Sequence, residues 1–319
     1  MNLRRVLITD AVHEVLPKGL EKLGYDLTYL PEISLAEVHQ VVHEYEGMVI
    51  NSKILVNKEL LDKAVKLEWV GRLGSGLEIV DLAYAKTKNV AILSSPSGNA
   101  PAVGEHALAM LLALSNKLLE GDAQVRKMQW DREAARGWEL KYRTVGIIGY
   151  GHTGPAFAKT LRGFENPILA FDKYKTGFAE ATPWVTAAAT AEEVLAQADV
   201  LSLHLPLTSE TEGYLNAEVI GRLKPGVIIV NTSRGKAIDL QALLDGLASG
   251  HIGGACLDVF PNEKTSTYTT SERELYAQLA NYQNVVLSPH VAGWTVESKR
   301  ALAEIVLNKV NAVASRSNR

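Results

Sequence analysis

Short apolar runs and amphipathic segments alternate along almost the whole of this chain. In the first hundred residues, apolar runs such as 5–9 and 47–51 are separated by amphipathic stretches such as 13–24 and 34–45. A second series of apolar runs follows at 144–148, 167–172, 184–187, 199–207, 226–231, 253–260 and 284–288. Alternation of this kind is typical of parallel β-sheets covered by helices on both faces. The pattern therefore predicts an α/β protein.

Residues 94–121 separate the two series. This segment begins with turn-forming residues and continues as a long predicted helix whose apolar residues lie almost all round the cylinder. A helix of this composition is normally buried between domains or between subunits, so we expect it at an interface. The length of 319 residues is enough for about two domains.

Charge and cysteine content exclude several classes of protein. The net charge of −3 offers no basic field to nucleic acid or to an anionic membrane. Cys256 is the only cysteine, so no intrachain disulfide forms, which fits a reducing compartment. The apolar run before Asp10 is too short for a signal peptide, and the run 107–114 is too short to span a bilayer. We expect a soluble, cytoplasmic protein without a nucleic-acid or membrane partner.

A glycine motif opens the second series. Gly149, Gly151 and Gly154 have the spacing G-x-G-x-x-G, after the apolar run 145–148 and before a helical segment. The first glycine permits a tight turn, the second lets the backbone approach a pyrophosphate, and the third lets helix and strand pack closely. The next apolar run ends at Asp172, at the separation expected for a ribose contact. This context predicts a dinucleotide site; an S-adenosylmethionine site and a turn without a ligand are the alternatives.

Arg234 directly follows a buried-strand pattern, in the stretch VIIVNTSRG. A cation at the mouth of such a strand must find water, a carboxylate or an anionic ligand. By itself the pattern leaves open a solvated loop arginine or a ligand-binding one. His290 and Glu263 are equally ambiguous alone, because a histidine beside a proline is often packed and a loop carboxylate is often solvated.

Several further motifs, in order along the chain, resemble the NAD-dependent D-2-hydroxyacid dehydrogenases, most closely the 3-phosphoglycerate dehydrogenase branch. They are VGRLGSGLEIVDL, GNAPAVGEHALAMLLAL, LHLPLTSETEGYLN, NTSRG, GGACLDVFPNEK and LSPHVAG. The resemblance implies an α/β fold of two Rossmann-like domains with parallel sheets, one flavodoxin-like and one NAD-binding, with the active site in the cleft between them. It implies a discontinuous substrate domain, 1–98 and 290–319, and an NAD-binding domain, 99–289.

The resemblance also implies a catalytic triad of Arg234, Glu263 and His290. In such a triad neutral histidine takes the hydroxyl proton of a 2-hydroxy acid, and the nicotinamide takes the C2 hydride. Glu263 pairs with the other ring nitrogen and raises the histidine pKa, while Arg234 grips the substrate carboxylate. The family commonly has a proline directly after this glutamate, where this chain has Lys264.

The remaining site residues are carried over from the family motifs. The implied cofactor-binding residues are Gly149, Gly151, His152, Thr153, Gly154, Asp172, His204, Leu205, Pro206, Thr232, Ser233, Asp258 and Gly293. The implied substrate-binding residues are Asn51, Ser52, Arg72, Ser75, Gly76 and Arg132. No metal ligand is expected. Arg72 and Arg132 match the phosphoglycerate branch, but Asn51 stands where that branch has arginine, so the site is only partly equipped for a phosphate.

The function implied is hydride transfer between NAD(H) and a D-2-hydroxy acid or its 2-keto acid. Both 3-phosphoglycerate and a small unphosphorylated acid remain open as substrates. The alternative is an NAD(H)-sensing binding protein of the corepressor type, which has the same fold and retains the triad. The family further implies a homodimer, formed through the helix that begins near Val103. The chain ends soon after the last helical segment, 297–310, so we expect no regulatory domain.

Overall fold

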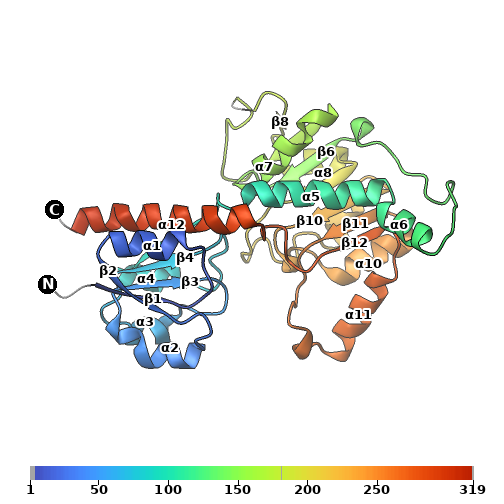
Figure 1. Cartoon of the computed structure of the whole chain (residues 1–319). Coiled ribbons are helices and arrows are strands. Elements are labelled where there is room, and N and C mark those ends of the chain that lie inside the picture. Colours follow the sequence, from blue (N-terminus) through green and yellow to red (C-terminus); the bar gives the residue numbers. More distant parts are fainter. Residues whose placement is uncertain (1–3, 181, 318–319) are drawn as a thin grey trace. The chain divides into compact units, whose positions relative to one another are not determined.

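The chain folds into two compact units, each built on a parallel β-sheet (Figure 1). The computed structural model describes residues 4–180 and 182–317. One unit contains residues 1–99 and 294–319, and the other contains residues 100–293. The α/β class predicted from the strand–helix alternation is therefore correct for both units.

The discontinuous unit has a five-stranded sheet in the order β2-β1-β3-β4-β5. Its strands are β1 (Arg4–Ile8), β2 (Tyr25–Tyr29), β3 (Gly47–Ile50), β4 (Trp69–Arg72) and β5 (Ala91–Ser94). Helices α1 (Val15–Lys22) and α12 (Val296–Ser317) pack together on one face of this sheet (Figure 1). The other face is covered by α2 (Leu35–Val41), α3 (Lys58–Lys63) and α4 (Leu82–Thr87). Ser34 and Asn57 cap α2 and α3, because their side chains accept from the N–H groups of Glu37 and Leu60.

Successive residues of β1 belong to different hydrophobic cores. Val6 and Ile8 pack on the face of α1 and α12, whereas Leu7 packs on the opposite face. Because neighbouring side chains of a strand point to opposite faces, a sheet covered on both sides needs apolar residues at every position. On the α12 face, Gly71 lets the helix approach closely, since a Cβ there would lie 2.7 Å from Cγ1 of Val306.

The continuous unit has a seven-stranded sheet in the order β12-β11-β10-β9-β6-β7-β8. Its strands are β6 (Val145–Ile148), β7 (Ile168–Phe171), β8 (Thr186–Ala187), β9 (Val200–Leu203), β10 (Val227–Asn231), β11 (Ile252–Leu257) and β12 (Val285–Leu287). Its helices are α5 (Ala100–Ser115), α6 (Leu118–Arg126), α7 (Thr153–Thr160), α8 (Ala191–Gln197), α9 (Ala217–Gly221), α10 (Leu240–Ser249) and α11 (Thr270–Ala280). The strand order reverses between β6 and β9, which is the position where doubly wound sheets bind ligands.

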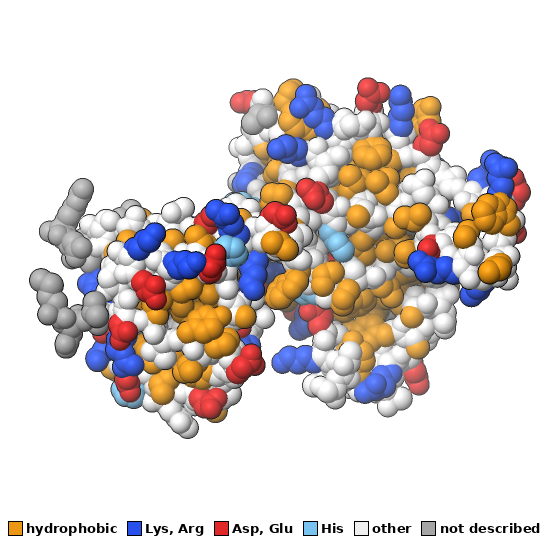
Figure 2. Space-filling model, viewed as in Figure 1, with side chains coloured by type: hydrophobic (Ala, Val, Ile, Leu, Met, Phe, Trp, Pro, Cys, Tyr) orange, Lys and Arg blue, Asp and Glu red, His pale blue; other side chains and the backbone are white. Residues whose placement is uncertain are grey.

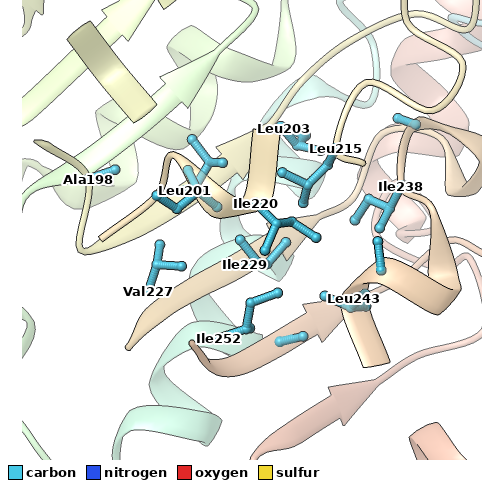
Figure 3. Packing of buried hydrophobic residues seen from close by; sticks show 14 of the residues in the cluster. Ala198, Leu201, Leu203, Leu215, Ile220, Val227, Ile229, Ile238, Leu243 and Ile252 are labelled. Atoms are coloured by element: carbon cyan, nitrogen blue, oxygen red, sulfur yellow. The ribbon is translucent and has the colours of Figure 1, made fainter. Parts of the chain in front are cut away.

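Apolar clusters cover both faces of the seven-stranded sheet. On one face Leu201 and Ile229 pack against Ile220 of α9 and Leu243 of α10 (Figure 3). On the other face Val145 and Ile147 join α5 and α7. This burial on two sides holds the strands in one register and fixes the loops at their carboxyl ends.

The long helix predicted within 94–121, after its opening turn residues, is divided into two helices in the structure. Helix α5 ends at Ser115, Lys117 takes a left-handed conformation with φ of +48°, and α6 starts afresh at Leu118. The chain returns to the end of α5 at Trp138, whose N–H donates to the Ser115 carbonyl at 2.9 Å. This tertiary bond satisfies a carbonyl that a continued helix would use, and apolar periodicity alone does not reveal it.

The unit boundary lies at residues 293/294 rather than at the expected 289/290. The backbone N–H of His290 donates to the Asp258 carbonyl, and those of Val291 and Ala292 donate to the Asp258 carboxylate. These bonds attach the segment to the continuous unit, which therefore contains His290 together with Arg234 and Glu263. Within the described part of the chain, no helix combines the length and apolar character needed to cross a bilayer.

Candidate active site

Arg234 lies just after β10, at the carboxyl edge of the seven-stranded sheet. Asn231 ends the strand and shapes the turn, because its side-chain oxygen accepts from the Ser233 N–H at 3.0 Å and hydroxyl at 2.8 Å. The Asn231 amide donates to the Arg234 carbonyl at 2.9 Å. The half-buried guanidinium donates to the Ser233 carbonyl at 2.7 Å. The turn thus holds a cation at the edge where open α/β sheets bind ligands.

Gly235 brings this turn against the loop that carries Glu263. A Cβ at Gly235 would lie 1.9 Å from the carbonyl carbon of Phe260, closer than any real contact. The two loops follow β10 and β11, which are parallel neighbours, so their carboxyl ends meet at the same sheet edge. Close backbone packing of these loops therefore requires glycine at position 235.

The loop after β12 carries His290 and is held by Asp258. The Asp258 carboxylate is fully buried; it accepts from the Ser288 hydroxyl at 2.5 Å and from the N–H groups of Val291 and Ala292, each at 2.9 Å. The Asp258 carbonyl accepts from the His290 N–H at 2.7 Å. His290 has a φ of +54°, a left-handed conformation that is uncommon for a residue with a side chain. The four hydrogen bonds that Asp258 accepts hold the loop, and with it His290, in this conformation.

His290 and Glu263 form the central pair of the site. Nδ1 of His290 lies 2.7 Å from Oε2 of Glu263, and Oε1 of Glu263 accepts from the Phe260 N–H at 3.3 Å. An ionised carboxylate has no proton to donate, so Nδ1 carries the proton of this bond. In the neutral imidazole, Nε2 is then a proton acceptor, and in the imidazolium it is a donor. The pair thus fixes the tautomer that acid–base chemistry at Nε2 requires.

The contact between His290 and Glu263 shifts their pKa values in opposite directions, upward for His290 and downward for Glu263. The hydrogen bond to Glu263 raises the pKa of His290, and the Glu263 and Asp258 charges add to this effect, while burial and Arg234 oppose it. Burial raises the pKa of Glu263, but the hydrogen bond and charge of His290, with the charge of Arg234, leave that pKa below its ordinary value. Arg234 therefore acts electrostatically on both members, and a proton taken up by the pair resides on His290.

The glycine motif forms the turn between β6 and α7. Gly149 has a φ of +93°, and a Cβ there would lie 2.4 Å from the carbonyl oxygen of His204. A Cβ on Gly154 would lie 2.2 Å from the carbonyl oxygen of Gly149, so both positions exclude a side chain. A Cβ on Gly151 would meet nothing within 4 Å. The backbone at Gly151 therefore faces open space, which the missing side chain leaves accessible. The loop thus has the shape of a phosphate cradle at a helix N-terminus.

His204 contacts the first residue of α7 through its side chain. Its imidazole is buried, with Nδ1 3.0 Å from the Thr153 hydroxyl and Nε2 2.9 Å from the Ser202 hydroxyl. Burial lowers the pKa of His204 to about 3, so the ring is neutral at physiological pH. A neutral ring that bridges two hydroxyls orients Thr153 at the start of the helix. Any effect of His204 on a ligand at this helix N-terminus would therefore pass through Thr153.

Asp172 closes the glycine loop from the end of β7. Its carboxylate accepts from the N–H groups of Tyr150 at 2.6 Å, and of Tyr174 and Lys175, each at 2.9 Å. A carboxylate offers about four lone-pair positions, so at least one remains for a ligand hydroxyl. The Lys175 ammonium donates to the carbonyls of Tyr150 and Gly151 at 3.2 and 2.8 Å. A cation therefore lies directly on the glycine loop.

Several buried side-chain polar atoms of the continuous unit have no hydrogen-bond partner among the described residues. One of them, the hydroxyl of Thr232, lies in the turn before Arg234. Such a group needs a partner, and a ligand amide at the sheet edge would supply one. Together with the open backbone at Gly151 and the acceptor position on Asp172, this residue set fits a dinucleotide. Nearby, Leu205 and Gly293 are half-buried, and His152 and Pro206 are exposed.

The predicted substrate residues divide between the two units. In the discontinuous unit, Asn51 and Ser52 follow β3, and Arg72 ends the neighbouring strand β4 with Ser75 and Gly76 just beyond it. These five residues therefore share one sheet edge. Lys53, the cation next to Ser52 in the chain, donates to the Pro31 carbonyl. Arg132 lies in the continuous unit, exposed on the segment after α6, and the described contacts do not connect it to Arg234, Glu263 or His290.

Sequence reasoning missed two supporting residues. His106 of α5 has Nε2 2.9 Å from the Ser288 hydroxyl and 3.6 Å from Asp258. Tyr276 of α11 bonds to the backbone of Asn262, next to Glu263. His106 lies on a helix whose apolar pattern indicates packing only, and neither motif spacing nor composition marks Tyr276. Among the described residues, no three His, Cys, Asp or Glu side chains gather as a metal site would require.

The continuous unit is a doubly wound domain with a glycine-rich turn before α7 and with Arg234, Glu263 and His290 on loops at the carboxyl ends of its strands. Residues 108–292 match the family model described as D-isomer specific 2-hydroxyacid dehydrogenase, NAD binding domain. The chain belongs to the D-isomer-specific 2-hydroxyacid dehydrogenase family. The family resemblance drawn from the motifs is therefore confirmed, and so is NAD as the cofactor of the domain.

Named relatives agree with this assignment. The chain is 32% identical to a D-3-phosphoglycerate dehydrogenase of Bacillus subtilis, over 96% of this chain and 56% of that protein. It is 31% identical to a hydroxypyruvate reductase of Thermotoga maritima over 86% of each chain. A crystal structure of D-lactate dehydrogenase from Aquifex aeolicus, complexed with NAD and lactic acid, has a TM-score of 0.82 at 28% identity, covering 97% of this chain and 95% of that one. The chain spans about half the length of the phosphoglycerate dehydrogenases it matches.

Proposed function

We propose that this protein is an NAD-dependent oxidoreductase that interconverts a D-2-hydroxy acid and the corresponding 2-keto acid. The observation that carries the proposal is the 2.7 Å contact between His290 Nδ1 and Glu263 Oε2, beside Arg234 and on the same unit as the glycine loop. A proton donor, a cation and a dinucleotide cradle are the three elements that reversible carbonyl reduction needs.

His290 handles the proton. In the reduction, its Nε2–H donates a proton to the C2 oxygen of the keto acid, and the imidazole becomes neutral. In the oxidation, neutral Nε2 removes the hydroxyl proton, and the imidazolium is stabilised by Glu263. NADH, when bound, supplies the hydride that C2 receives. Glu263 keeps the proton of Nδ1 in place throughout, so only Nε2 exchanges its proton with substrate.

Arg234 binds and polarises the substrate. Its guanidinium has forked donors that match a carboxylate, and its charge stabilises the negative charge that develops on the C2 oxygen during hydride transfer. The residues that would hold the cofactor are the glycine loop with His152 and Thr153 at the pyrophosphate, Asp172 at the ribose, and Leu205 and Pro206 at the adenosine side. Thr232, Ser233, Asp258 and Gly293 would lie on the nicotinamide side.

The substrate is a small 2-keto or 2-hydroxy acid. Asn51, Ser52, Arg72, Ser75, Gly76 and Arg132 are the proposed substrate-binding residues, in a substrate domain built on residues 1–99 and 294–319. Arg72 supports a phosphorylated acid, and Asn51, in place of an arginine, supports an unphosphorylated one. The relatives include both kinds, since a phosphoglycerate dehydrogenase and a hydroxypyruvate reductase match equally well in identity.

The protein is further proposed to be a cytoplasmic homodimer that does not bind nucleic acid. The segment around α6 exposes several large apolar side chains close together in the sequence (Figure 2). They are Leu118, Leu119, Met128 and Trp130. Exposed apolar patches are uncommon on monomeric proteins and often mark interfaces. A second copy of the chain would cover them. The net charge of −3 supports the absence of a nucleic-acid partner.

A reductase screen tests the function. NADH and NADPH are each combined with hydroxypyruvate, glyoxylate, pyruvate, 2-oxoglutarate and 3-phosphohydroxypyruvate, and nucleotide oxidation is followed by absorbance. His290→Ala should lower turnover of the best substrate by about 10²–10⁴-fold while leaving NADH affinity nearly unchanged. The matched control is His43→Ala, an exposed histidine of the other unit. NADH binding without turnover of any substrate would instead identify a cofactor-sensing binding protein.

A further inference from the structure

Glu263 lies on a loop that offers its carboxylate little support of its own. The side chain is 40% exposed, and the residues directly after it, 264–267, are all exposed. An exposed ion pair gains little when both side chains must be ordered to form it. The contact with His290 therefore depends on how firmly the loop backbone is held.

Tyr276 of α11 holds the residue before Glu263 by two hydrogen bonds. Its hydroxyl donates to the Asn262 carbonyl at 3.0 Å and accepts from the Asn262 N–H at 3.2 Å. The ring meets Phe260 edge-on at 5.8 Å and Tyr268 at 4.7 Å between centroids. Phe260 in turn donates its N–H to Glu263. The Tyr276 side chain thus contacts the Glu263 loop both before Glu263, at Phe260 and Asn262, and after it, at Tyr268.

The Asn262 side chain completes the support. Its oxygen accepts from the Lys264 N–H at 3.0 Å, and its amide donates to Thr267 at 3.1 Å and to Glu272 at 3.0 Å. Glu272 also accepts from the N–H of Thr269 in the capping box that starts α11. The loop is therefore fastened to the first two turns of α11.

We propose that Tyr276 is a positioning residue that, through Asn262, keeps the Glu263 carboxylate on His290 and so sets the pH at which His290 exchanges its proton. The charged groups that act on His290 are Glu263, Asp258 and Arg234. Those that act on Tyr276 are Glu272, Glu263 and Tyr268. Of the groups acting on His290, only Glu263 belongs to the loop that Tyr276 holds, so loss of the tyrosine hydroxyl should weaken that pair selectively.

The test is an imidazole titration of the 319-residue protein without added cofactor. Tyr276→Phe removes both hydrogen bonds to Asn262 but keeps the ring contacts. Tyr268→Phe is the matched control, because it removes a hydroxyl from the neighbouring ring of the same aromatic group. The signals of the 8 histidines are followed by two-dimensional NMR against pH, and His290→Gln identifies the relevant one. Circular dichroism checks that each variant is folded.

We expect the pKa of His290 to fall in Tyr276→Phe and to stay at the wild-type value in Tyr268→Phe. The role in turnover rests on the proposed function: keto-acid reduction by Tyr276→Phe should fall on the order of tenfold at pH values above the lowered pKa, with little change in KM. An unchanged His290 titration in Tyr276→Phe, or an equal shift in Tyr268→Phe, overturns the proposal. A wild type without turnover would count against the proposed function alone, since the titration needs no catalysis.

Discussion

Nδ1 of His290 lies 2.7 Å from Oε2 of Glu263, although the two residues are 27 positions apart and follow different strands. Each residue is held by a separate device: His290 by the buried carboxylate and carbonyl of Asp258, and Glu263 by Asn262 and Tyr276.

Glu263→Gln should lower the pKa of His290, because an amide no longer favours the imidazolium. Keto-acid reduction needs protonated His290 and is lost as pH rises through its pKa, so in the variant this loss should occur at lower pH. Hydroxy-acid oxidation needs neutral His290 and should persist to lower pH. The measurement is kcat/KM against pH in both directions, with Glu274→Gln on the exposed side of α11 as the control. Identical profiles for Glu263→Gln and wild type would show that Glu263 is not the partner.

Asp258→Asn should destabilise the fold and impair turnover together. The buried carboxylate accepts three hydrogen bonds, and the amide would point an N–H₂ group at donors that need an acceptor. A loss of about 2–4 kcal/mol in the free energy of unfolding is expected from urea denaturation. Ser288→Ala removes only one of these donors and should cost about 1 kcal/mol. If Asp258→Asn unfolds at the wild-type urea concentration, the buried carboxylate does not hold the loop.

Gly235→Ala should separate the Arg234 turn from the Glu263 loop. The added Cβ has no space beside the Phe260 backbone, so one loop must move, at a cost of about 1–3 kcal/mol in stability. Because the site spans both loops, kcat/KM should fall as well. Gly221→Ala is the control, since a Cβ there meets nothing within 4 Å. Equal activity in the two variants would contradict the required close approach.

Asp172→Ser should narrow the preference for NADH over NADPH. In the wild type, a 2′-phosphate would meet the Asp172 carboxylate at close range, which favours NADH. Lys175, on the glycine loop, is the nearby cation that could bind such a phosphate, whereas Lys173 is paired with Glu210 at 2.5 Å. Lys175→Met should therefore reduce the use of NADPH by the Asp172→Ser variant, and Lys173→Met should not. The measurement is the ratio of kcat/KM with NADH to kcat/KM with NADPH. If Asp172→Ser leaves this ratio unchanged, Asp172 does not determine the preference for NADH.

Side-chain periodicity and motif spacing were enough to predict the class of fold and the chemistry available to the site. The apolar run 227–230, set between helical segments, indicates a strand buried on both faces, and G-x-G-x-x-G between an apolar run and a helical segment indicates a tight turn with an open backbone. These are local properties, set by side-chain periodicity and by the absence of a Cβ. The motif order was sufficient to identify the family.

Which side chains support one another could be seen only in the folded chain. The break at Lys117, the capture of the His290 loop by Asp258, and the anchoring of Glu263 by Tyr276 all join segments that are distant in sequence. No periodicity encodes them, because each depends on where a strand end and a helix face meet after folding. The sequence named His290 and Glu263 through a family resemblance, but the backbone bonds that fix their geometry follow from packing of the strands and helices around them.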